Sequence, residues 1–349
     1  MKKIAIVIAD LDLGGGQRVA ISLANALARD NDVSIIIFQD DDIHYQAPKG
    51  LIHLDCPQKT SIPGKILNVF KRAYKLRKLF KKEKFDHVYS FMETANFPTA
   101  MAFPDAAISV HCNPMVFTFF ERTLVRLCYP RVKNVIAVSD DVVDILRTDY
   151  ELKNVSRIYN PINIEEIQAQ ASPAYQHEKP YIVALGRFHE VKRYDLLISA
   201  YAQSKLQKEC DLIIVGDGEL RTDLEAQISQ LNMQEKIHLA GVQSNPFPYL
   251  AGAKFLALSS RTEAFPTVLI EALALECPVV ATDCPTGPRE IIREGENGLL
   301  VENENSQALS QAIDKLYFDD ELLSTFKKSA IPSIQHLSGE IISKKWLAL

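Results

Sequence analysis

The chain has 349 residues, of which 47% are hydrophobic and 24% charged, and its formal net charge is −5. This composition indicates a soluble folded protein of about two domains and excludes a disordered or low-complexity chain. The six cysteines form no C-x-x-C pair and do not group with histidines at zinc spacing, so we expect reduced thiols in a cytosolic protein. The apolar runs are too short for a signal peptide or a membrane-spanning helix, and we expect neither.

The chain opens with a predicted strand followed by a glycine loop. Residues 3–9 form a short apolar run rich in β-branched side chains, and residues 17–29 have helical apolar spacing. Gly14-Gly15-Gly16 lies between them, and glycine allows a backbone to approach a phosphate at the start of a helix. The dinucleotide fingerprint is incomplete because Val19 stands where its third glycine belongs. A tight turn is the alternative.

Asp40-Asp41-Asp42 follows the second predicted strand, residues 33–38. Three successive carboxylates could bind a metal, but the stretch after them is irregular, and we favour a solvated loop. No other ligand cluster stands out in the sequence, so we expect no metal.

Residues 65–84 carry nine basic side chains and a single acid, Glu83. At 3.6 residues per turn, the apolar side chains of this predicted helix share one face, part of which should pack on the domain. These apolar side chains are Ile66, Val69, Phe70, Ala73, Leu76 and Phe80. The basic side suits an anionic membrane surface or a pyrophosphate. No aromatic stacking platform accompanies it, so we expect no nucleic acid partner. An ordinary surface helix is the alternative.

Three more strand patterns follow, at residues 85–91, 107–110 and 134–138. His111 comes directly after the second of them, where ligand-binding residues of open α/β sheets lie. After a strand at 155–159, Asn160-Pro161-Ile162 turns the chain into a polar stretch, 164–179, that we interpret as a linker.

The second half begins with a predicted strand at residues 181–186. Arg187 and Lys192 follow on one loop, where two cations could converge on a diphosphate. Arginine would bind it bidentately, and lysine would act as a point charge. Two independent surface charges are the alternative.

Residues 259–285 read as loop, helix and strand, with a helix start at Thr267 after Pro266. The first amides of such a helix, those of Thr267, Val268 and Leu269, suit a phosphate. Glu263 lies on the entering loop and Glu271 one turn inside the helix, and carboxylates accept hydrogen bonds from sugar hydroxyls. Glu263 could hold a hexose and Glu271 a ribose, which points to a nucleotide-diphosphate sugar. Two solvated glutamates are the alternative.

The motifs around these glutamates resemble a known family. They are Phe265-Pro266-Thr267 between the glutamates, Gly287-Pro288-Arg289-Glu290 after the next strand, and Gly216-Asp217-Gly218-Glu219-Leu220 after the strand at 211–215. Over nearly its whole length the chain resembles retaining glycosyltransferases of the large GT-B family 4. The resemblance implies an α/β protein of two Rossmann-like domains with parallel sheets facing a central cleft. The implied division is an acceptor-binding domain at 1–163, the linker, a nucleotide-sugar domain at 180–335, and a C-terminal helix at 336–349 that packs back toward the first domain.

The resemblance also implies roles for individual residues. Gly15 and Gly16 would border the reacting phosphate, His111 would contact the donor sugar, and Gly241 and Val242 would border the base. The predicted catalytic residues are Arg187, Lys192, Glu263 and His111. The predicted donor-binding residues are Gly15, Gly16, Gly186, Gly241, Val242, Phe265, Pro266, Thr267, Val268, Leu269 and Glu271.

The basic run is similar to a helix of bacterial family 4 enzymes that extend lipid-linked oligosaccharides, in particular N-acetylgalactosaminyltransferases acting on undecaprenyl-diphosphate glycans. This implies retaining transfer from a nucleotide sugar, UDP-GalNAc by preference, to a polyprenyl-diphosphate glycan at the cytoplasmic face of the membrane, without a cofactor. Arg72, Lys75, Arg77 and Lys78 would hold the acceptor's pyrophosphate at the membrane surface. Another UDP- or GDP-sugar, used for capsule, O-antigen or other surface glycan, is the alternative.

Three other classes of protein remain as rivals. A GT-B nucleotide-sugar epimerase would need acid–base carboxylates near the sugar and no lipid-binding patch. A Rossmann oxidoreductase is disfavoured by the incomplete glycine fingerprint. A non-catalytic protein of the same fold would bind the nucleotide without turnover.

Overall fold

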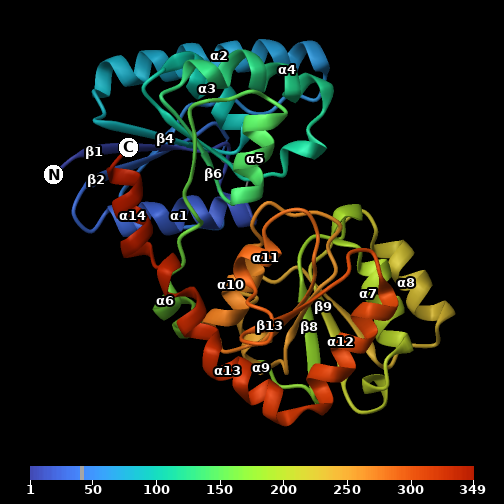
Figure 1. Ribbon diagram of the computed structural model, residues 1–349. Coiled ribbons are helices and arrows are strands. Elements are labelled where there is room, and N and C mark those ends of the chain that lie inside the picture. The colour runs from blue at the N-terminus through green and yellow to red at the C-terminus, as the bar shows by residue number, and fades with distance from the viewer. Residues whose placement is uncertain (40–42) are drawn as a thin grey trace. The chain divides into compact units, whose positions relative to one another are not determined.

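The computed structural model describes residues 1–39 and 43–349, so the predicted solvated loop at Asp40-Asp41-Asp42 lies outside the described residues. The chain forms two compact units (Figure 1). Unit 1 comprises Met1–Ile162 and Gly339–Leu349, and unit 2 comprises Asn163–Ser338. Each unit is described below by itself.

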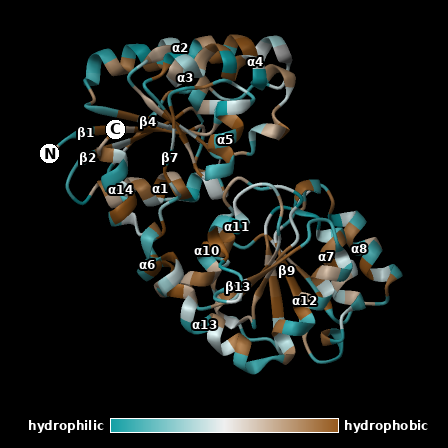
Figure 2. Cartoon of the chain, viewed as in Figure 1, coloured by the Kyte–Doolittle hydropathy of each residue, from teal (hydrophilic) through white to brown (hydrophobic). Residues whose placement is uncertain are grey.

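Unit 1 is built on a seven-stranded sheet with the strand order β3-β2-β1-β4-β5-β6-β7, in which every neighbouring pair is parallel. The strands are β1 (Lys3–Val7), β2 (Asp32–Ile37), β3 (Gly50–His53), β4 (His87–Phe91), β5 (Ala107–Val110), β6 (Asn134–Ala137) and β7 (Val155–Arg157). The central strands are nearly continuous apolar runs because helices cover both faces of a parallel sheet (Figure 2).

The helices of unit 1 lie in two layers, one on each side of this sheet. They are α1 (Gly15–Leu27), α2 (Ile62–Glu83), α3 (Glu93–Ala102), α4 (Phe119–Cys128), α5 (Asp140–Thr148) and α14 (Gly339–Leu347), with short 3-10 turns at Pro114–Val116 and Tyr129–Arg131. α3 packs between α2 and α4 on one side, and α1 packs with α14 on the other.

The C-terminal helix α14 is anchored in unit 1 by Trp346, the single tryptophan of the chain. Its ring lies 4.9 Å from the ring of Tyr89 and 5.5 Å from that of Phe91, centroid to centroid. The Tyr89 hydroxyl donates to the Trp346 carbonyl at 2.8 Å. Aromatic contacts of this kind bury a large apolar area, so the last residues of the chain belong to the core of unit 1.

Unit 2 has a six-stranded parallel sheet with the order β10-β9-β8-β11-β12-β13. The strands are β8 (Tyr181–Leu185), β9 (Asp211–Val215), β10 (Ile237–Gly241), β11 (Leu256–Leu258), β12 (Val279–Thr282) and β13 (Gly298–Val301). The order of strands reverses direction between β8 and β11, and ligands of open α/β sheets bind at the carboxyl ends of the strands beside such a switch point. The predicted α/β class with parallel sheets is confirmed.

The helices of unit 2 also form two layers, with α7, α8 and α12 on one side and α9, α10 and α13 on the other. The helices are α6 (Ile164–Gln170), α7 (Tyr194–Gln203), α8 (Arg221–Gln230), α9 (Phe247–Gly252), α10 (Thr267–Ala274), α11 (Pro288–Ile291), α12 (Ser306–Phe318) and α13 (Asp320–Ile334), with 3-10 turns at Glu190–Lys192, Leu206–Lys208 and Gln335–Leu337. In the part of the chain that the structure describes, no helix combines the length and the apolar character needed to cross a membrane.

Two helices of unit 2 differ from the sequence expectation. α6 lies within the stretch interpreted as a linker, where Asn163 caps it by accepting from the Glu166 amide at 3.3 Å and Ile167 is buried. α13 was not predicted, and it buries Leu323, Phe326 and Ile334. Both are short or interrupted amphipathic segments, whose stability comes from packing more than from local propensity.

Candidate functional site

Three neighbouring strands of unit 2 end in glycines with positive φ. They are Gly186 after β8, with φ +148°, Gly216 after β9, with φ +143°, and Gly241 at the end of β10, with φ +72°. The Gly216 amide donates to the Gly241 carbonyl at 2.9 Å. A Cβ on Gly216 would collide with the carbonyl oxygen of Gly186, whereas a Cβ on Gly241 would meet nothing within 4 Å. Two of the glycines therefore allow close backbone packing, and the third leaves open space beside Val242, which is 60% exposed.

Lys192 and Glu263 meet at the same edge of this sheet although they are far apart in the sequence. Lys192 Nζ lies 2.6 Å from Glu263 Oε1, and their side chains are only 23% and 12% exposed. The Ser260 hydroxyl donates to the same carboxylate oxygen at 2.7 Å, and the Ser259 hydroxyl donates to the Lys192 carbonyl at 2.8 Å. The serines follow β11 directly, so the switch-point strands position both charged groups.

The loop that carries Glu263 is tied to the loop after β12. The Glu263 amide donates to the Pro285 carbonyl at 3.0 Å, and the Thr286 hydroxyl donates to the Glu263 carbonyl at 2.5 Å. Gly287 has φ +92°, and a Cβ there would lie 2.7 Å from the Ala264 carbonyl oxygen. The glycine of the Gly-Pro-Arg-Glu motif thus lets the loop after β12 hold Glu263 in place.

Helix α10 begins at Thr267, as the sequence predicts, with Pro266 as its N-cap and Phe265 buried before it. The Leu269 amide donates to the Pro266 carbonyl at 3.1 Å, so this amide is already engaged within the first turn. The amides of Thr267 and Val268 precede it and remain the predicted phosphate donors, because the leading amides of a helix have no intrahelical partner.

Glu271 is buried in α10, at 4% exposure, so the alternative of a solvated helix glutamate is wrong. A carboxylate at such a position needs hydrogen-bond donors, and carboxyl groups are seldom buried without them. The residue is therefore buried one turn inside the helix whose start is the predicted phosphate site.

Arg187 does not join Lys192 and Glu263 in this structure. Its guanidinium is 72% exposed and lies 3.2 Å from Glu219 Oε2, on the loop after β9. His189 approaches the other oxygen of Glu219 at 3.6 Å. The predicted convergence of Arg187 and Lys192 on one diphosphate thus requires Arg187 to exchange Glu219 for a ligand.

In unit 1 the glycine loop lies against the end of β4. α1 begins at Gly15, and a Cβ on Gly16 would come within 2.6 Å of the Met92 sulfur. Met92 itself has φ +68°, and it immediately precedes α3. Glycine at position 16 therefore permits a close approach between the loops that follow β1 and β4.

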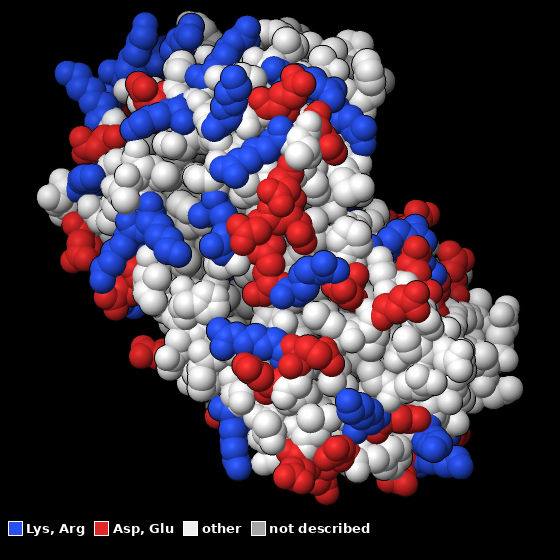
Figure 3. Space-filling view, in the orientation of Figure 1, with Lys and Arg blue, Asp and Glu red and all other residues white. Residues whose placement is uncertain are grey.

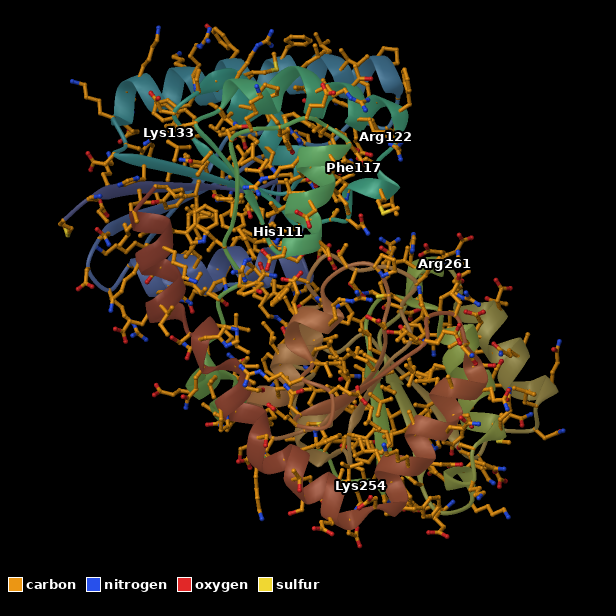
Figure 4. The ribbon with its side chains drawn as sticks, in the orientation of Figure 1. His111, Phe117, Arg122, Lys133, Lys254 and Arg261 are labelled. Carbon is orange, nitrogen blue, oxygen red and sulfur yellow. The ribbon has the colours of Figure 1, made fainter. Side chains whose placement is uncertain are left out.

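His111 follows β5, and its ring lies 5.3 Å from that of Phe91, centroid to centroid. Its Nε2 is shielded from solvent and has no hydrogen-bond partner among the described residues. Burial lowers the pKa of His111 to about 4, so the imidazole is neutral at physiological pH. Figure 4 shows the labelled side chain at the end of the unit 1 sheet. A neutral imidazole can exchange one hydrogen bond with a sugar hydroxyl, but it does not neutralise a phosphate.

Glu93 is a residue that the sequence analysis missed. It begins α3 directly after β4, the parallel neighbour of β5, and so shares a sheet edge with His111. The residue is 7% exposed, and its Oε1 has no partner in the described part of the chain. Burial, with the charge of Glu121 as a smaller contribution, raises the pKa of Glu93 to about 7. Its position two residues after the end of an apolar strand, close to that of His111 on the next strand, was the sequence signal that could have identified it.

Comparison with known proteins decides the family. The model of the family described as "Glycosyltransferase Family 4" matches residues 13–166, and that of "Glycosyl transferases group 1" matches residues 165–331. A curated Campylobacter jejuni protein is 32% identical over 95% of this chain and 94% of its own length. The chain belongs to the family 4 glycosyltransferases.

The C. jejuni relative of this glycosyltransferase is named N-acetylgalactosamine-N,N'-diacetylbacillosaminyl-diphospho-undecaprenol 4-alpha-N-acetylgalactosaminyltransferase. A second C. jejuni relative, 28% identical over all of this chain and 98% of its own length, is named GalNAc-alpha-(1->4)-GalNAc-alpha-(1->3)-diNAcBac-PP-undecaprenol alpha-1,4-N-acetyl-D-galactosaminyltransferase. As a member of the family, the protein is a hexosyltransferase.

Solved structures establish the fold of this glycosyltransferase. HepE from Anabaena, in complex with UDP and glucose, superimposes with a TM-score of 0.80 at 21% identity and covers all of this chain and 99% of its own. Sucrose-phosphate synthase from Thermosynechococcus elongatus gives a TM-score of 0.85 at 18% identity over all of this chain and 98% of its own. The predicted GT-B class is confirmed.

The residues of the basic helix α2 that were predicted to bind the acceptor differ in their exposure to solvent. Arg72 is 3% exposed, donates to the Cys56 carbonyl at 3.0 and 2.9 Å, and lies over the Phe38 ring. Burial lowers the pKa of its guanidinium from the ordinary value. The placement of Arg72 on an exposed basic surface is thus corrected, because the residue is turned into unit 1 where it satisfies loop carbonyls.

The other three basic residues differ in exposure. The Lys75 ammonium donates to the carbonyls of Leu54 and Asp55 and is only partly exposed. Arg77 reaches the Met101 carbonyl at 3.4 Å from an exposed position, and Lys78 is exposed. Of the four predicted acceptor residues, Arg77 and Lys78 are the ones that face solvent.

The outward side of α2 carries apolar as well as basic side chains. Leu67 is 70% exposed, Phe70 55% and Tyr74 71%, whereas Ala73, Leu76 and Phe80 are buried. Phe70 was predicted to share the apolar face, only part of which was expected to pack, and it lies on the exposed side of the helix. We call the exposed stripe the outer face of α2; its members are Leu67, Phe70, Lys71, Tyr74, Lys78 and Lys81. Figure 3 shows basic side chains gathered over this part of unit 1.

One side-chain cluster among the described residues has donor atoms close enough for a metal ion. His177 and His238 lie 2.9 and 3.3 Å from the same oxygen of Asp211, at the amino end of β9. Lys179 approaches the other Asp211 oxygen at 3.7 Å. Hydrogen bonds and this ammonium compensate the buried carboxylate, and the cluster lies at the end of the sheet opposite the Lys192–Glu263 pair.

Proposed function

We propose that this family 4 enzyme transfers an N-acetylhexosamine, with retention, from UDP-GalNAc to a glycan on polyprenyl diphosphate at the cytoplasmic face of a membrane. The main support for binding of the donor sugar nucleotide is the Lys192–Glu263 ion pair of 2.6 Å, whose glutamate lies a few residues before the start of α10. The names of the two C. jejuni relatives support the sugar and the lipid-linked acceptor. The UDP bound to HepE supports a UDP donor.

The donor diphosphate would be neutralised by a lysine and a helix start, both from unit 2. Lys192 supplies a full positive charge, and the amides of Thr267 and Val268 add aligned partial charges. Without donor, Lys192 is paired with Glu263. On binding, the ammonium would also face the diphosphate, while the carboxylate accepts hydrogen bonds from sugar hydroxyls. Both groups are fixed beforehand by the serines after β11, so little reorganisation is needed as charge develops on the leaving phosphate.

Bond cleavage would rely on stabilisation of the leaving group and on positioning. The breaking bond joins the anomeric carbon to a phosphate oxygen, and the new bond joins that carbon to the acceptor oxygen on the same face. The departing phosphate oxygen takes the acceptor proton, so the charge balances without an enzymatic nucleophile. Until that proton is transferred, Lys192 offsets the additional negative charge that develops on the leaving diphosphate. Arg187 would contribute after leaving Glu219.

Buried Glu271 would bind the ribose, and the space beside Gly241 and Val242 would admit the base. His111 is neutral, so its role would be one hydrogen bond to a sugar hydroxyl. These assignments need no metal, because the lysine, the helix amides and Arg187 provide the positive charge.

The acceptor side rests on the outer face of α2. Exposed Leu67, Phe70 and Tyr74 among lysines suit the interfacial region of an anionic bilayer, where apolar side chains insert and ammonium groups meet lipid phosphates. This face would hold the enzyme at the surface where a polyprenyl-linked acceptor lies. Arg77 and Lys78 stay the predicted contacts for its pyrophosphate.

The test is a panel of UDP- and GDP-sugars, each incubated with a polyprenyl-diphosphate glycan, with release of nucleoside diphosphate and product as readouts. We expect turnover with UDP-GalNAc and an α-linked product by NMR. Lys192→Ala should lower kcat by about 100-fold or more, the loss typical of one removed transition-state donor. Lys254→Ala, an exposed lysine before β11, is the matched control. Turnover with another UDP- or GDP-sugar and none with UDP-GalNAc would contradict the proposed donor. A β-linked product would contradict the proposed retention of configuration.

A further inference from the structure

Unit 1 contains a pocket of about 200 Å³ between α2, α3 and α4. The residues that give it its character are Lys59, Lys65, Glu93, Phe97 and Phe120. The two lysines are exposed, whereas Glu93 and Phe97 are more than nine-tenths buried. The pocket therefore has a positively charged rim and an interior that contains aromatic rings, the Glu93 carboxyl group and the buried Arg72 guanidinium.

Most other polar groups that line the pocket are already engaged. The Asn68 amide donates to the Pro57 carbonyl at 2.9 Å, and its oxygen accepts from the Cys56 thiol at 3.1 Å. Arg72 binds the Cys56 carbonyl. Glu121 accepts from the amide and the hydroxyl of Thr118, both at 2.8 Å, as part of a helix capping box. These contacts hold the walls of the pocket.

Glu93 is different, because its Oε1 has no hydrogen-bond partner among the described residues. An unpaired acceptor that is buried costs free energy comparable with its lost hydration, and nearly all buried polar atoms in folded proteins have a partner. A pocket that leaves one carboxyl oxygen unsatisfied is suited to a ligand that brings a hydrogen-bond donor.

The surroundings of Glu93 indicate what kind of donor this is. Phe97 and Phe120 offer apolar surface against which the C–H face of a sugar ring packs, and sugar hydroxyls or an acetamido N–H are donors that a carboxyl group accepts. Lys59 and Lys65 at the rim suit a phosphate. A hydroxyl-rich ring joined to a phosphate matches all three features in one molecule.

We propose that this pocket is an acceptor subsite that binds the phosphate-linked sugar of the lipid-linked glycan. Glu93 accepts a hydrogen bond from a hydroxyl or acetamido group of that sugar, and Lys59 and Lys65 meet its phosphate. This inference rests on the proposed function, and it adds Glu93, which selects a sugar phosphate over a lipid phosphate alone. It moves the contact for the sugar-linked phosphate from Arg77 and Lys78 to Lys59 and Lys65, because Lys65 lies about 18 Å from Arg77 along α2. The subsite is separate from the outer face of α2, which contacts the membrane.

The kinetic test uses UDP-GalNAc and a short-chain, water-soluble polyprenyl-diphosphate glycan, so that membrane binding does not contribute. Glu93→Leu should raise the acceptor KM at least tenfold, and Glu93→Gln, which retains one acceptor, should raise it less. Lys65→Gln should raise it several-fold. Lys153→Gln, the same charge change at an exposed lysine of the same unit, should change it less than twofold. In all four variants the KM for UDP-GalNAc should stay within twofold of the wild-type value, which would show that the variants are folded.

A binding test shows which part of the ligand the pocket recognises. Calorimetry compares the affinities of the protein for N-acetylgalactosamine 1-phosphate, N-acetylgalactosamine and inorganic phosphate. We expect the sugar phosphate to bind most tightly, and Glu93→Leu and Lys65→Gln each to weaken it at least fivefold. Equal affinity for inorganic phosphate would overturn the sugar subsite. An acceptor KM within twofold of wild type in Glu93→Leu and Lys65→Gln would overturn it while the transferase proposal stands. Absence of wild-type transfer to any polyprenyl-diphosphate acceptor would overturn the proposed function and this inference together.

Discussion

Lys192 and Glu263, 71 residues apart in the chain, form an ion pair of 2.6 Å at the carboxyl edge of the unit 2 sheet. Both side chains are less than a quarter exposed, and a serine hydroxyl shares the carboxylate. Removing one partner of such a pair leaves the other charge poorly solvated, whereas removing both does not. This asymmetry gives a stability test that is independent of turnover.

We expect Lys192→Met to destabilise the protein more than the double variant Lys192→Met/Glu263→Gln. A coupling free energy of roughly 0.5–3 kcal/mol is typical for residues in direct contact. Thermal unfolding of wild type, both single variants and the double variant measures it. Additive changes would show that the two side chains do not interact, which would remove the structural basis of the donor site.

Gly216 gives a second prediction. Gly216→Ala places a Cβ against the Gly186 carbonyl at φ +143°, a conformation close to glycine-only backbone space. We expect a loss of more than about 3 kcal/mol in unfolding free energy, since a clash adds to the backbone strain of roughly 1–3 kcal/mol. Gly295→Ala is the matched control, because Gly295 also has positive φ, +78°, but a Cβ there meets nothing within 4 Å. Equal losses in the two variants, measured by chemical denaturation, would show that the close strand-end packing has no energetic consequence.

Much of this architecture could be predicted from local patterns. Short apolar runs mark the central strands, and Pro266 before Thr267 marks the start of α10. Lys192 and Glu263 were both predicted for one site because each follows a strand end, and parallel strands bring their carboxyl ends to one edge. The site residues as a set stay predictions about ligand contacts.

Other features depend on packing that no local pattern encodes. Phe70 and Arg72 lie two positions apart in α2, within one turn, and periodicity placed the phenylalanine on the apolar face and the arginine on the basic face. In the structure Phe70 is exposed and Arg72 is buried, because the Arg72 guanidinium donates to the Cys56 carbonyl and lies over the Phe38 ring. Glu93 looks like any acid at a helix start, and its pKa shift arises from the helices that enclose it.

The pKa of Glu93 gives a third prediction, on the pH dependence of stability. The pKa is raised from an ordinary value of 4.5 to about 7, so the folded protein holds this proton more tightly than the unfolded chain does. Its contribution to stability is therefore full below pH 4.5 and is lost as the pH rises to about 7. The Glu93→Gln variant does not ionise at this position, so its stability does not fall in this pH range. We expect its free energy of unfolding to exceed that of wild type by about 3 kcal/mol at pH 8 and to be nearly equal to it at pH 4.5.

Thermal unfolding of wild type and Glu93→Gln between pH 4.5 and 8 tests this expectation. Glu151→Gln, an exposed glutamate of the same unit, is the control for a general effect of removing a negative charge. A constant difference in stability between wild type and Glu93→Gln across this range would show that the carboxyl group is not buried as the structure has it.

The outer face of α2 gives the last prediction, on membrane binding. Leu67, Phe70 and Tyr74 are each more than half exposed, and insertion of such side chains contributes about 1 kcal/mol or more apiece. We expect the triple serine variant at these positions to bind vesicles with 30% anionic lipid at least tenfold more weakly than wild type in a sedimentation assay. Phe318→Ser, at a phenylalanine of unit 2 that is 52% exposed, is the matched control for Phe70→Ser, where the wild-type side chain is 55% exposed. Binding that disappears with salt but is insensitive to the triple variant would assign attachment to the lysines alone, because screening weakens only their contribution.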